Sequence, residues 1–263
     1  MQKIIVFAGS KQSGKSSTSN FLHGHIMKKN EQIKYFDISE EGQLLVNSLV
    51  EENGQEVEKQ GIIDINRKDY DFSQYAMYHI WPFIKSYNFA DRLKESTCNI
   101  FGIEPALVWG SNEDKETLTN IKMSDFGFAF LPKEIEEMKK EGIYNKPITV
   151  RKLLQLFGTK VCRRIQDSCW IDRCIQDIKI EECPIATVSD CRFINEVEAM
   201  KKIGAKIIKF KRKIDEDKDE SEIALDNYED VDLIVDNQNM TVHEKNIFVF
   251  EYLKSIGWVE GDI

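Results

Sequence analysis

The sequence predicts a three-layer α/β domain with a mostly parallel, five-stranded sheet at its centre. Two observations predict it: short runs rich in Ile, Val and Phe alternate with segments of helical spacing, and a glycine-framed loop follows the first run. Such alternation favours parallel strands joined by right-handed crossovers. The five predicted strands are 4–8, 33–37, 184–190, 205–211 and 231–236.

Three helices can be bounded from their capping residues. An amphipathic helix is expected over 15–29, directly after the glycine-framed loop. Thr149 is a good N-cap for a helix over 150–157, and Gly158 is a good stop. A third helix is expected over 195–204, from an asparagine at its start to a glycine at the C′ position.

The whole chain, 1–263, is predicted to form one domain with additions to its sheet. Residues 39–148 are mixed in composition and poorly periodic, so we expect an inserted, mostly helical subdomain there, with 83–89 as a candidate extra strand. Residues 213–222 are dense in charge. They fit either a solvated loop or the centre of a mobile lid over about 211–230.

Composition argues against several classes of function. The 263 residues carry a formal net charge of −9, which disfavours a general electrostatic grip on DNA or RNA. No apolar stretch approaches the roughly 18 residues needed to cross a bilayer, and the six cysteines show no C-x-x-C spacing. We therefore expect a cytoplasmic protein with reduced thiols and without a nucleic-acid or membrane partner; a homodimer is left open.

The glycine-framed loop carries the strongest chemical signal. Residues 9–16 read G-S-K-Q-S-G-K-S and match G-x-x-x-x-G-K-[ST], with an apolar strand before the loop and a helix after it. Gly9 and Gly14 let successive backbone N–H groups face inward as an anion nest, and the helix N-terminus adds partial positive charge. The pattern is that of a phosphate-binding loop, or P-loop, so the expected fold is the P-loop NTPase fold.

Each residue type in the loop has a role in holding ATP and Mg²⁺. Lys15 supplies a mobile cation to the β- and γ-phosphates, the Ser16 hydroxyl ligates magnesium, and Ser17 contacts the α-phosphate. A lid residue could close over the same phosphates. The candidate donor-binding residues are Gly9, Lys11, Ser13, Gly14, Lys15, Ser16, Ser17 and, from the predicted lid, Arg212.

The loop identifies the phosphate donor but leaves the reaction open. A GTPase would need an N-K-x-D motif, and residues 145–148 read N-K-P-I, without the Asp. Motor and AAA-type ATPases usually end their second catalytic strand in two acidic residues, whereas here Asp190 is followed by Cys191. Kinases of small molecules are the class that remains.

Asp190 and Arg192 supply a second part of the predicted site. They lie at the carboxyl end of a predicted core strand, which is where ligands bind in open α/β sheets. Asp190 is placed to hold a magnesium-bound water, and Arg192 to neutralise charge on the transferring phosphoryl group. The alternative is a structural ion pair at a strand end.

The helix over 150–157 offers polar side chains that suit an acceptor. Arg151 and Gln155 lie four residues apart and share a helix face, and Arg163 or Arg164 follows farther along the chain. Such a face could grip an acceptor phosphate or base. The pattern by itself fits an ordinary exposed polar face equally well.

Beside the P-loop, five stretches occur in a characteristic order. They read F-A-D-R-L-K-E at 89–95, W-G-S-N-E-D-K at 109–115, L-Q-L-F-G-T at 154–159, D-C-R-F-I-N-E at 190–196, and E-S-E through L-D-N to D-N at 220–237. With the P-loop they span most of residues 3–240. In this order they resemble the deoxynucleoside monophosphate kinases encoded by tailed phages.

The resemblance implies a nucleoside monophosphate kinase fold with an acceptor-binding insertion and a closing lid. The residues that it implies to face the acceptor or the transferring phosphate are Asp91, Lys94, Gln155, Arg163 and Arg192. The chain departs from the family pattern at Arg92, Lys160, Ile194 and Asp219. These departures concern the acceptor and lid regions rather than the phosphate chemistry.

The activity that the resemblance implies is transfer of the γ-phosphate of ATP to the 5′-monophosphate of a deoxynucleotide. No general base is required, because the acceptor phosphate has a second pKa of about 6 and is largely a dianion at neutral pH. Two alternatives stay open. One is a kinase of the same fold for dephospho-coenzyme A or phosphomevalonate; the other is a P-loop regulator that binds ATP without an acceptor.

Overall fold

The chain divides into two compact units. The computed structural model describes residues 2–52, 55–212 and 224–261. Unit 1 comprises Met1–Asn88 and Ile175–Ile263, and unit 2 comprises Phe89–Cys174. The predicted insertion over about 39–148 is therefore divided between the units at residue 88. No helix within the described ranges is long and apolar enough to cross a membrane.

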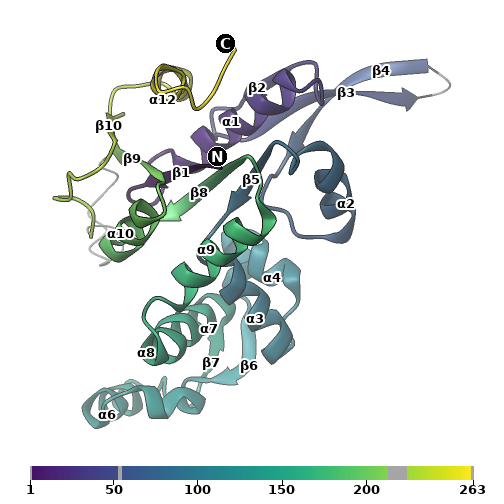
Figure 1. The fold of residues 1–263 in the computed structure, drawn as a ribbon. Helices are drawn as coiled ribbons and strands as arrows, with labels where there is room; N and C mark the ends of the chain where they lie inside the picture. The colour runs from purple at the N-terminus through teal and green to yellow at the C-terminus, as the bar shows by residue number, and fades with distance from the viewer. Residues whose placement is uncertain (1, 53–54, 213–223, 262–263) are drawn as a thin grey trace. The chain divides into compact units, whose positions relative to one another are not determined.

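Unit 1 is built on a parallel five-stranded sheet in the order β10-β9-β1-β8-β5 (Figure 1). Its strands are β1 (Lys3–Ala8), β5 (Ile84–Tyr87), β8 (Ile185–Cys191), β9 (Lys206–Lys211) and β10 (Leu233–Asp236). At the centre, Val6 pairs with Val188 on one side and with Ile207 on the other. All three side chains are fully buried, as expected for strands covered on both faces. Four of the five predicted strands are confirmed.

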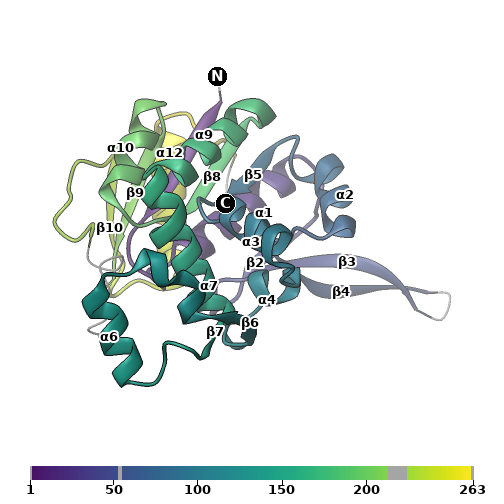
Figure 2. The ribbon, with the colours of Figure 1, turned by 90° about the horizontal axis from the view of Figure 1, so that it is seen from below.

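The fifth predicted strand, 33–37, is wrong as a member of this sheet. β2 (Phe36–Ile38) pairs antiparallel with β3 (Leu44–Glu52), which continues into β4 (Gln55–Ile63), so these three strands form a separate sheet (Figure 2). β5 occupies the edge position beside β8 instead. A strand in a parallel sheet needs both faces covered, and three of the four residues of β5 are buried whereas none of β2 is.

Helices cover both faces of the main sheet. α1 (Lys15–Lys29) and α12 (Val242–Ser255) pack together on one face, and α10 (Ile194–Lys202) covers β1 and β9 on the other (Figure 1). This is the predicted three-layer arrangement. The predicted amphipathic character of α1 is wrong, because most of its residues are buried. β2 packs on its remaining side, where a Cβ at Gly24 would lie 2.3 Å from the Phe36 ring.

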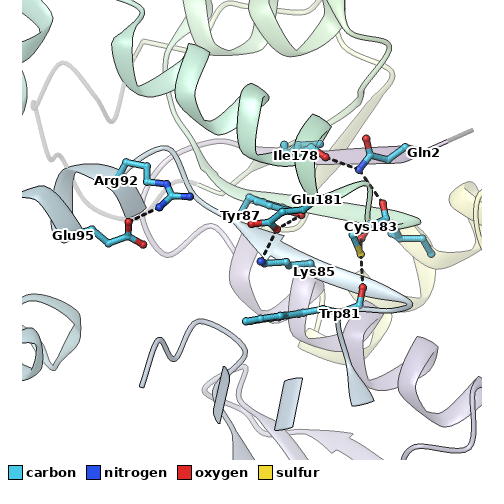
Figure 3. Close-up of polar contacts among 10 residues, drawn as sticks. Gln2, Trp81, Lys85, Tyr87, Arg92, Glu95, Ile178, Glu181 and Cys183 are labelled. Atoms are coloured by element: carbon cyan, nitrogen blue, oxygen red, sulfur yellow. Dashed lines mark hydrogen bonds and ion pairs between the residues drawn. The ribbon is translucent and has the colours of Figure 1, made fainter. Parts of the chain in front are cut away.

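Polar contacts fasten the edge strand β5 beside the end of α9 (Cys169–Glu181), as Figure 3 shows. Lys85 Nζ lies 2.5 Å from Glu181 Oε2, and the Tyr87 hydroxyl donates to the same oxygen at 2.8 Å. Gln2 Nε2 donates to Ile178 O, in α9, at 3.0 Å and to Cys183 O, in the connection from α9 to β8, at 2.9 Å. These contacts fasten β5 and the start of β1 to the end of α9 and the turn that leads into β8.

Unit 2 is mostly helical and has its own apolar core. Its elements are, in order, α3 (Asp91–Phe101), α4 (Pro105–Trp109), α5 (Asn112–Lys115), β6 (Leu118–Lys122), a 3₁₀ helix (Met123–Ala129), α6 (Pro132–Lys140), β7 (Pro147–Thr149), α7 (Val150–Gln155), a π-helical turn (Leu156–Cys162) and α8 (Arg163–Ile165). The remaining helix, α2 (Tyr70–His79), belongs to unit 1. Leu153 and Leu156 of the long helical stretch pack in the core beside Phe126.

The stretch that begins with α7 confirms one predicted end and corrects the other. Thr149 is the N-cap, and its hydroxyl accepts from the backbone N–H of Lys152 at 3.2 Å. Gly158 does not stop the helix, which continues through the π-helical turn into α8. Gly158 is buried, and a Cβ there would lie 2.6 Å from Leu93 Cδ2. The glycine thus lies in close contact with Leu93 of α3 inside a continuing helical stretch, rather than at a helix end.

The predicted helix over 195–204 is confirmed with a one-residue change at its start. α10 begins at Ile194, and the buried Glu196 carboxylate accepts from the backbone N–H of Phe193 at 3.1 Å. At the other end Gly204 has a φ of +83°, and its N–H donates to Lys201 O at 2.9 Å. Gly204 is thus the C′ residue that the sequence predicts.

Candidate nucleotide-binding site

The P-loop joins β1 to α1 and has the backbone that its glycines predict. Gly9 has a φ of +136° and Gly14 a φ of +98°. A Cβ would lie 2.7 Å from Phe210 O at the first glycine and 2.7 Å from Lys245 Nζ at the second. Gly9 therefore excludes a side chain through conformation and through space, and Gly14 chiefly through its conformation. Gly9 N donates to Cys191 O at 3.2 Å, which ties the start of the loop to the carboxyl end of β8.

Lys15 begins α1, and its side chain folds back onto the loop. The residue is only 6% exposed. Its ammonium donates to Gly9 O at 2.8 Å and to Ser10 O, and it lies 3.4 Å from Ser13 Oγ. The Lys15 ammonium thus lies beside the P-loop. Rotation of the flexible lysine side chain can bring the ammonium to an anion that is bound in the loop. This arrangement fits the phosphate-binding role predicted for Lys15.

The two serines after Lys15 lie in different surroundings. Ser16 is exposed, so its hydroxyl can reach a metal ion on the solvent side of the helix terminus. Ser17 is buried; its hydroxyl donates to Gly14 O at 2.9 Å and accepts from Lys245. The backbone N–H groups of the first helical turn have no intrahelical acceptor. A contact from Ser17 to a phosphate would therefore come from its backbone N–H.

Asp190 and Arg192 lie at the base of the P-loop, on the neighbouring strand. β8 pairs with β1 so that Cys191 is opposite Ala8, the last strand residue before the loop. Asp190 is half-buried within β8, and Arg192 follows the strand directly. The turn is fixed by the buried carboxylate of Glu196, which accepts from the backbone N–H of Arg192 at 2.8 Å. The sheet therefore brings these two predicted residues to the same edge as the P-loop.

Three residues that sequence reasoning did not assign to the site hold the P-loop from the side of β10 and α12. The hydrogen bonds run from Asn237 Nδ2 to Ser13 O (2.9 Å), from Lys245 Nζ to Gly14 O (2.9 Å) and from Thr18 Oγ1 to Asn246 Oδ1 (2.9 Å). These partners are separated by 224 to 231 residues in the sequence. Asn237 lies in one of the stretches that carry the family resemblance, whereas no local pattern singles out Lys245 or Asn246.

A small polar cluster at the carboxyl ends of β5 and β8 was also missed. Asn88 follows β5, and its Oδ1 accepts from Ser189 Oγ at 3.3 Å, on β8. Asn66 Oδ1 accepts from Asn88 Nδ2 at 3.2 Å and from Ser86 Oγ at 3.1 Å. The cluster lies on the sheet edge that carries the P-loop and joins the carboxyl ends of the two strands through side chains.

The predicted acceptor residues lie in unit 2. Asp91 begins α3 and is 9% exposed. Lys94, one turn later, has its ammonium 6.0 Å from the centre of the Trp109 ring. Arg151, on α7, is ion-paired with Glu116 and also donates to Asn112 Oδ1 at 3.0 Å. Gln155 and Arg163 stand at the two ends of the π-helical turn, the first exposed and the second half-buried.

Lys115 joins Lys94 and Arg151 in a cationic cluster, although sequence reasoning did not select it. Burial lowers the pKa of Lys115, and the positive charges of Lys94 and Arg151 lower it further. Its ammonium donates to Gly110 O at 2.5 Å. Lys94, from α3, and Arg151, from α7, therefore act electrostatically on Lys115, from α5, and Asp114 opposes part of this effect. A bound anion such as a phosphate would oppose it further. We refer to Lys94, Lys115 and Arg151 as the cationic cluster.

The predicted lid is described only in part. Residues 213–223, which include the whole charge-dense segment 213–222, lie outside the described residues. Lys211, at the end of β9, lies 3.6 Å from Glu229 in an ion pair. Arg212 is exposed directly after that strand. Closure of this segment over a nucleotide stays a prediction.

Comparisons with known proteins cover both units. A model of the family described as "Deoxynucleotide monophosphate kinase" matches residues 3–245. The "Deoxynucleoside-5'-monophosphate kinase" of Escherichia phage T5 is 35% identical over 68 residues, which is 26% of this chain. The chain matches about a quarter (27%) of that relative's length. The family match thus includes the P-loop, the cationic cluster and Arg192, whereas the match to the phage protein is local.

Proposed function

The chain belongs to the deoxynucleotide monophosphate kinase family, and on that premise we propose that it transfers the γ-phosphate of ATP to the 5′-phosphate of a deoxynucleoside monophosphate. The products are ADP and a deoxynucleoside diphosphate. In this proposal unit 1 binds ATP with Mg²⁺, and unit 2 binds the acceptor. Both substrates are cytoplasmic metabolites, so the proposed location is the cytoplasm, that of the host if the gene is a phage's.

The observation that carries the proposal is the P-loop, with the Lys15 ammonium bonded to its backbone. The positive φ of Gly9 and of Gly14 is the backbone conformation that lets successive N–H groups face a bound phosphate. Lys15 lies within the same loop and can neutralise the β- and γ-phosphates. Gly9, Lys11, Ser13, Gly14, Ser16, Ser17 and Arg212 are the further residues proposed for the donor.

The residues near the loop fit Mg²⁺, which prefers oxygen ligands and keeps several waters. Ser16 offers an exposed hydroxyl, and Asp190 offers a half-buried carboxylate at the end of the adjacent strand. Ser16 would hold the ion directly, and Asp190 would hold one of its waters. Bound there, Mg²⁺ would supply charge neutralisation between the donor phosphates.

The acceptor is assigned to unit 2 because its charged and amide groups suit a nucleoside monophosphate. Lys94 and Arg151 can neutralise a phosphate dianion, and the guanidinium of Arg163 can add a third cationic contact. Gln155 carries an amide that both donates and accepts, which suits a base edge. Asp91 is proposed to face the acceptor on the strength of the family resemblance.

Transfer in this proposal depends on positioning and charge rather than on a general base. The acceptor phosphate is already a dianion at neutral pH and is the nucleophile. Two anions must approach each other, so Lys15 and Arg192 lower their repulsion as the phosphoryl group moves. Water competes as an acceptor, which is the reason to expect a closing segment over about 211–230.

Coupled measurement of ADP release, with a panel of monophosphates, tests the proposal. Release that depends on deoxynucleoside monophosphates supports it. Release stimulated only by dephospho-coenzyme A or phosphomevalonate would point to the first alternative, and ATP turnover without acceptor dependence would point to a P-loop regulator. Light scattering on the same preparation decides between a monomer and a homodimer.

A further inference from the structure

Lys245, on α12, is a buried cation attached to the P-loop. It is 2% exposed. Its ammonium donates to Gly14 O at 2.9 Å and to Ser17 Oγ, and it lies 5.8 Å from the centre of the Phe210 ring. An ammonium has three N–H donors, and the described residues supply acceptors for two of them. Gly14 is the N-cap of α1, and Ser17 lies in its first turn.

This location is electrostatically unfavourable for a cation. The first turn of a helix carries partial positive charge, and cations are stabilised at the opposite end. Gly14 and Ser17 are neutral, and within residues 2–52, 55–212 and 224–261 the charged group that acts on the ammonium is Arg212, after β9. Burial and, second, the charge of Arg212 lower the pKa of Lys245 to about 8. Without an anion nearby, the charged form of this side chain is therefore destabilised.

Lys209, on β9, is a second buried lysine, and its ammonium has a full set of hydrogen-bond acceptors. It is 3% exposed, and its ammonium donates to the carbonyls of Leu225, Asp226 (2.9 Å) and Tyr228 (2.8 Å). All three N–H donors are used, and the bonds hold residues 225–228 against the sheet. Lys209 is a structural residue. Lys245 has fewer acceptors for its ammonium, and the helix terminus and Arg212 make its surroundings less favourable for a positive charge.

We propose that Lys245 is a positioning residue of the nucleotide site, and that its counter-charge is the polyphosphate of a bound nucleoside di- or triphosphate. It acts through Gly14 and Ser17: it holds the first turn of α1, whose N–H groups face the phosphates, and it adds positive charge behind them. The proposal rests on the donor half of the proposed function and is independent of the acceptor.

The first test replaces the charge and keeps much of the side-chain volume, in Lys245→Met. The melting temperature of the nucleotide-free variant should not fall, because an unfavourable buried charge is removed. The Kd for ATP should rise about tenfold, since a cation near the phosphates is lost. Calorimetric titration gives the Kd, and thermal unfolding with and without ATP gives the stabilisation by nucleotide, which should shrink.

Lys209→Met is the matched control, because it removes a lysine of similar burial from the same unit. Its melting temperature should fall, since three buried carbonyls lose their donor. Its Kd for ATP should change less than that of Lys245→Met, because Lys209 bonds residues 225–228 near the end of the predicted lid and makes no contact with Gly14 or Ser17. The two variants thus change stability and affinity in opposite patterns if the two lysines have the roles proposed.

The second test uses the wild-type protein and measures protons. The pKa of Lys245 is about 8 in the nucleotide-free protein, below its usual 10.5, and bound phosphates raise it again. Nucleotide binding between about pH 8 and pH 10 should therefore take up protons, and affinity should fall as pH rises through that range. Phosphates of ATP are already ionised there. Titration in buffers of different ionisation enthalpy measures the uptake, which should shrink in Lys245→Met.

Several results would overturn the proposal. A Lys245→Met variant that melts earlier and binds ATP with wild-type Kd would make Lys245 a structural brace, and a variant unchanged in both would remove any role. If Lys245→Met loses both stability and affinity, or does not fold, the wild-type proton uptake decides, and its absence contradicts the proposal. Wild-type protein that does not bind ATP would instead contradict the donor half of the proposed function.

Discussion

The P-loop of unit 1 and the cationic cluster of unit 2 hold positive charge in different ways. In unit 1 the Lys15 ammonium is buried and bonded to carbonyls of its own loop. In unit 2 the cations come from three separate helices, and Arg151 is paired with Glu116, whose side chain is 56% exposed. The first arrangement is set by the backbone of contiguous residues, and the second by side chains that can rearrange.

The difference teaches where each kind of specificity can reside. A backbone nest recognises phosphate whatever else the ligand carries, so it suits a common donor. Side chains on separate helices can be replaced one at a time without disturbing a loop, so they suit recognition of a particular acceptor. Charge effects should also be larger in the buried loop than in the partly exposed cluster, because solvent screens the latter.

The largest effect is expected for Lys15→Ala in the P-loop. Turnover should fall by about 10²-fold or more, since the variant removes a cation directed at charge that develops in the transition state. Steady-state kinetics measure the fall, and circular dichroism checks that the fold is kept. A kcat near that of the wild type would contradict the role of Lys15 and, with it, the contrast between the two regions.

Arg192 should show the next largest effect. Charge between the phosphates is most concentrated as the phosphoryl group moves, so Arg192→Ala should lower kcat by about 10- to 100-fold with little change in either Kd. Arg192→Lys keeps the charge but loses the planar fork, and a smaller fall is expected. Lost affinity with preserved kcat would make Arg192 a binding residue only.

Alanine variants in unit 2 should have smaller and selective effects. At Lys94, Arg151 and Gln155 the KM for the monophosphate should rise about three- to tenfold, while the KM for ATP stays constant, because these groups are partly exposed. Lys152→Ala is the control, since that side chain is exposed on α7 beside Arg151. Variants that only melt earlier, with unchanged kinetics, would show that these residues are structural; Asp91 and Arg163 can be tested in the same way.

The smallest effect concerns stability alone. Thr149→Ala removes the hydroxyl that accepts from Lys152 N and should cost about 1 kcal/mol of folding free energy in unit 2. Chemical denaturation measures the loss, and the Kd for ATP should not change, because the cap lies outside unit 1. A changed ATP affinity would show that the two regions are coupled more closely than this comparison assumes.

The predictable parts of the fold are those determined by neighbours in the sequence. β1, β8, β9 and β10 were recognisable from apolar runs, and Thr149 and Gly204 from their capping chemistry. The P-loop was recognisable for the same reason: all its residues are contiguous, so their spacing alone determines the backbone. Such features need no knowledge of what packs against them.

The remaining features were decided by tertiary structure. Two apolar segments, 33–37 and 84–87, were both candidates for the edge of the sheet. The second lies there, paired with β8 and largely buried. Gly158 carries a helix-stop signal, but the helical stretch continues through it, where it lies against Leu93 of α3. Lys245 meets Gly14 across 231 residues of sequence. Local propensities are worth about 1 kcal/mol or less per residue, so burial and long-range contacts, which no spacing pattern records, decide wherever the two disagree.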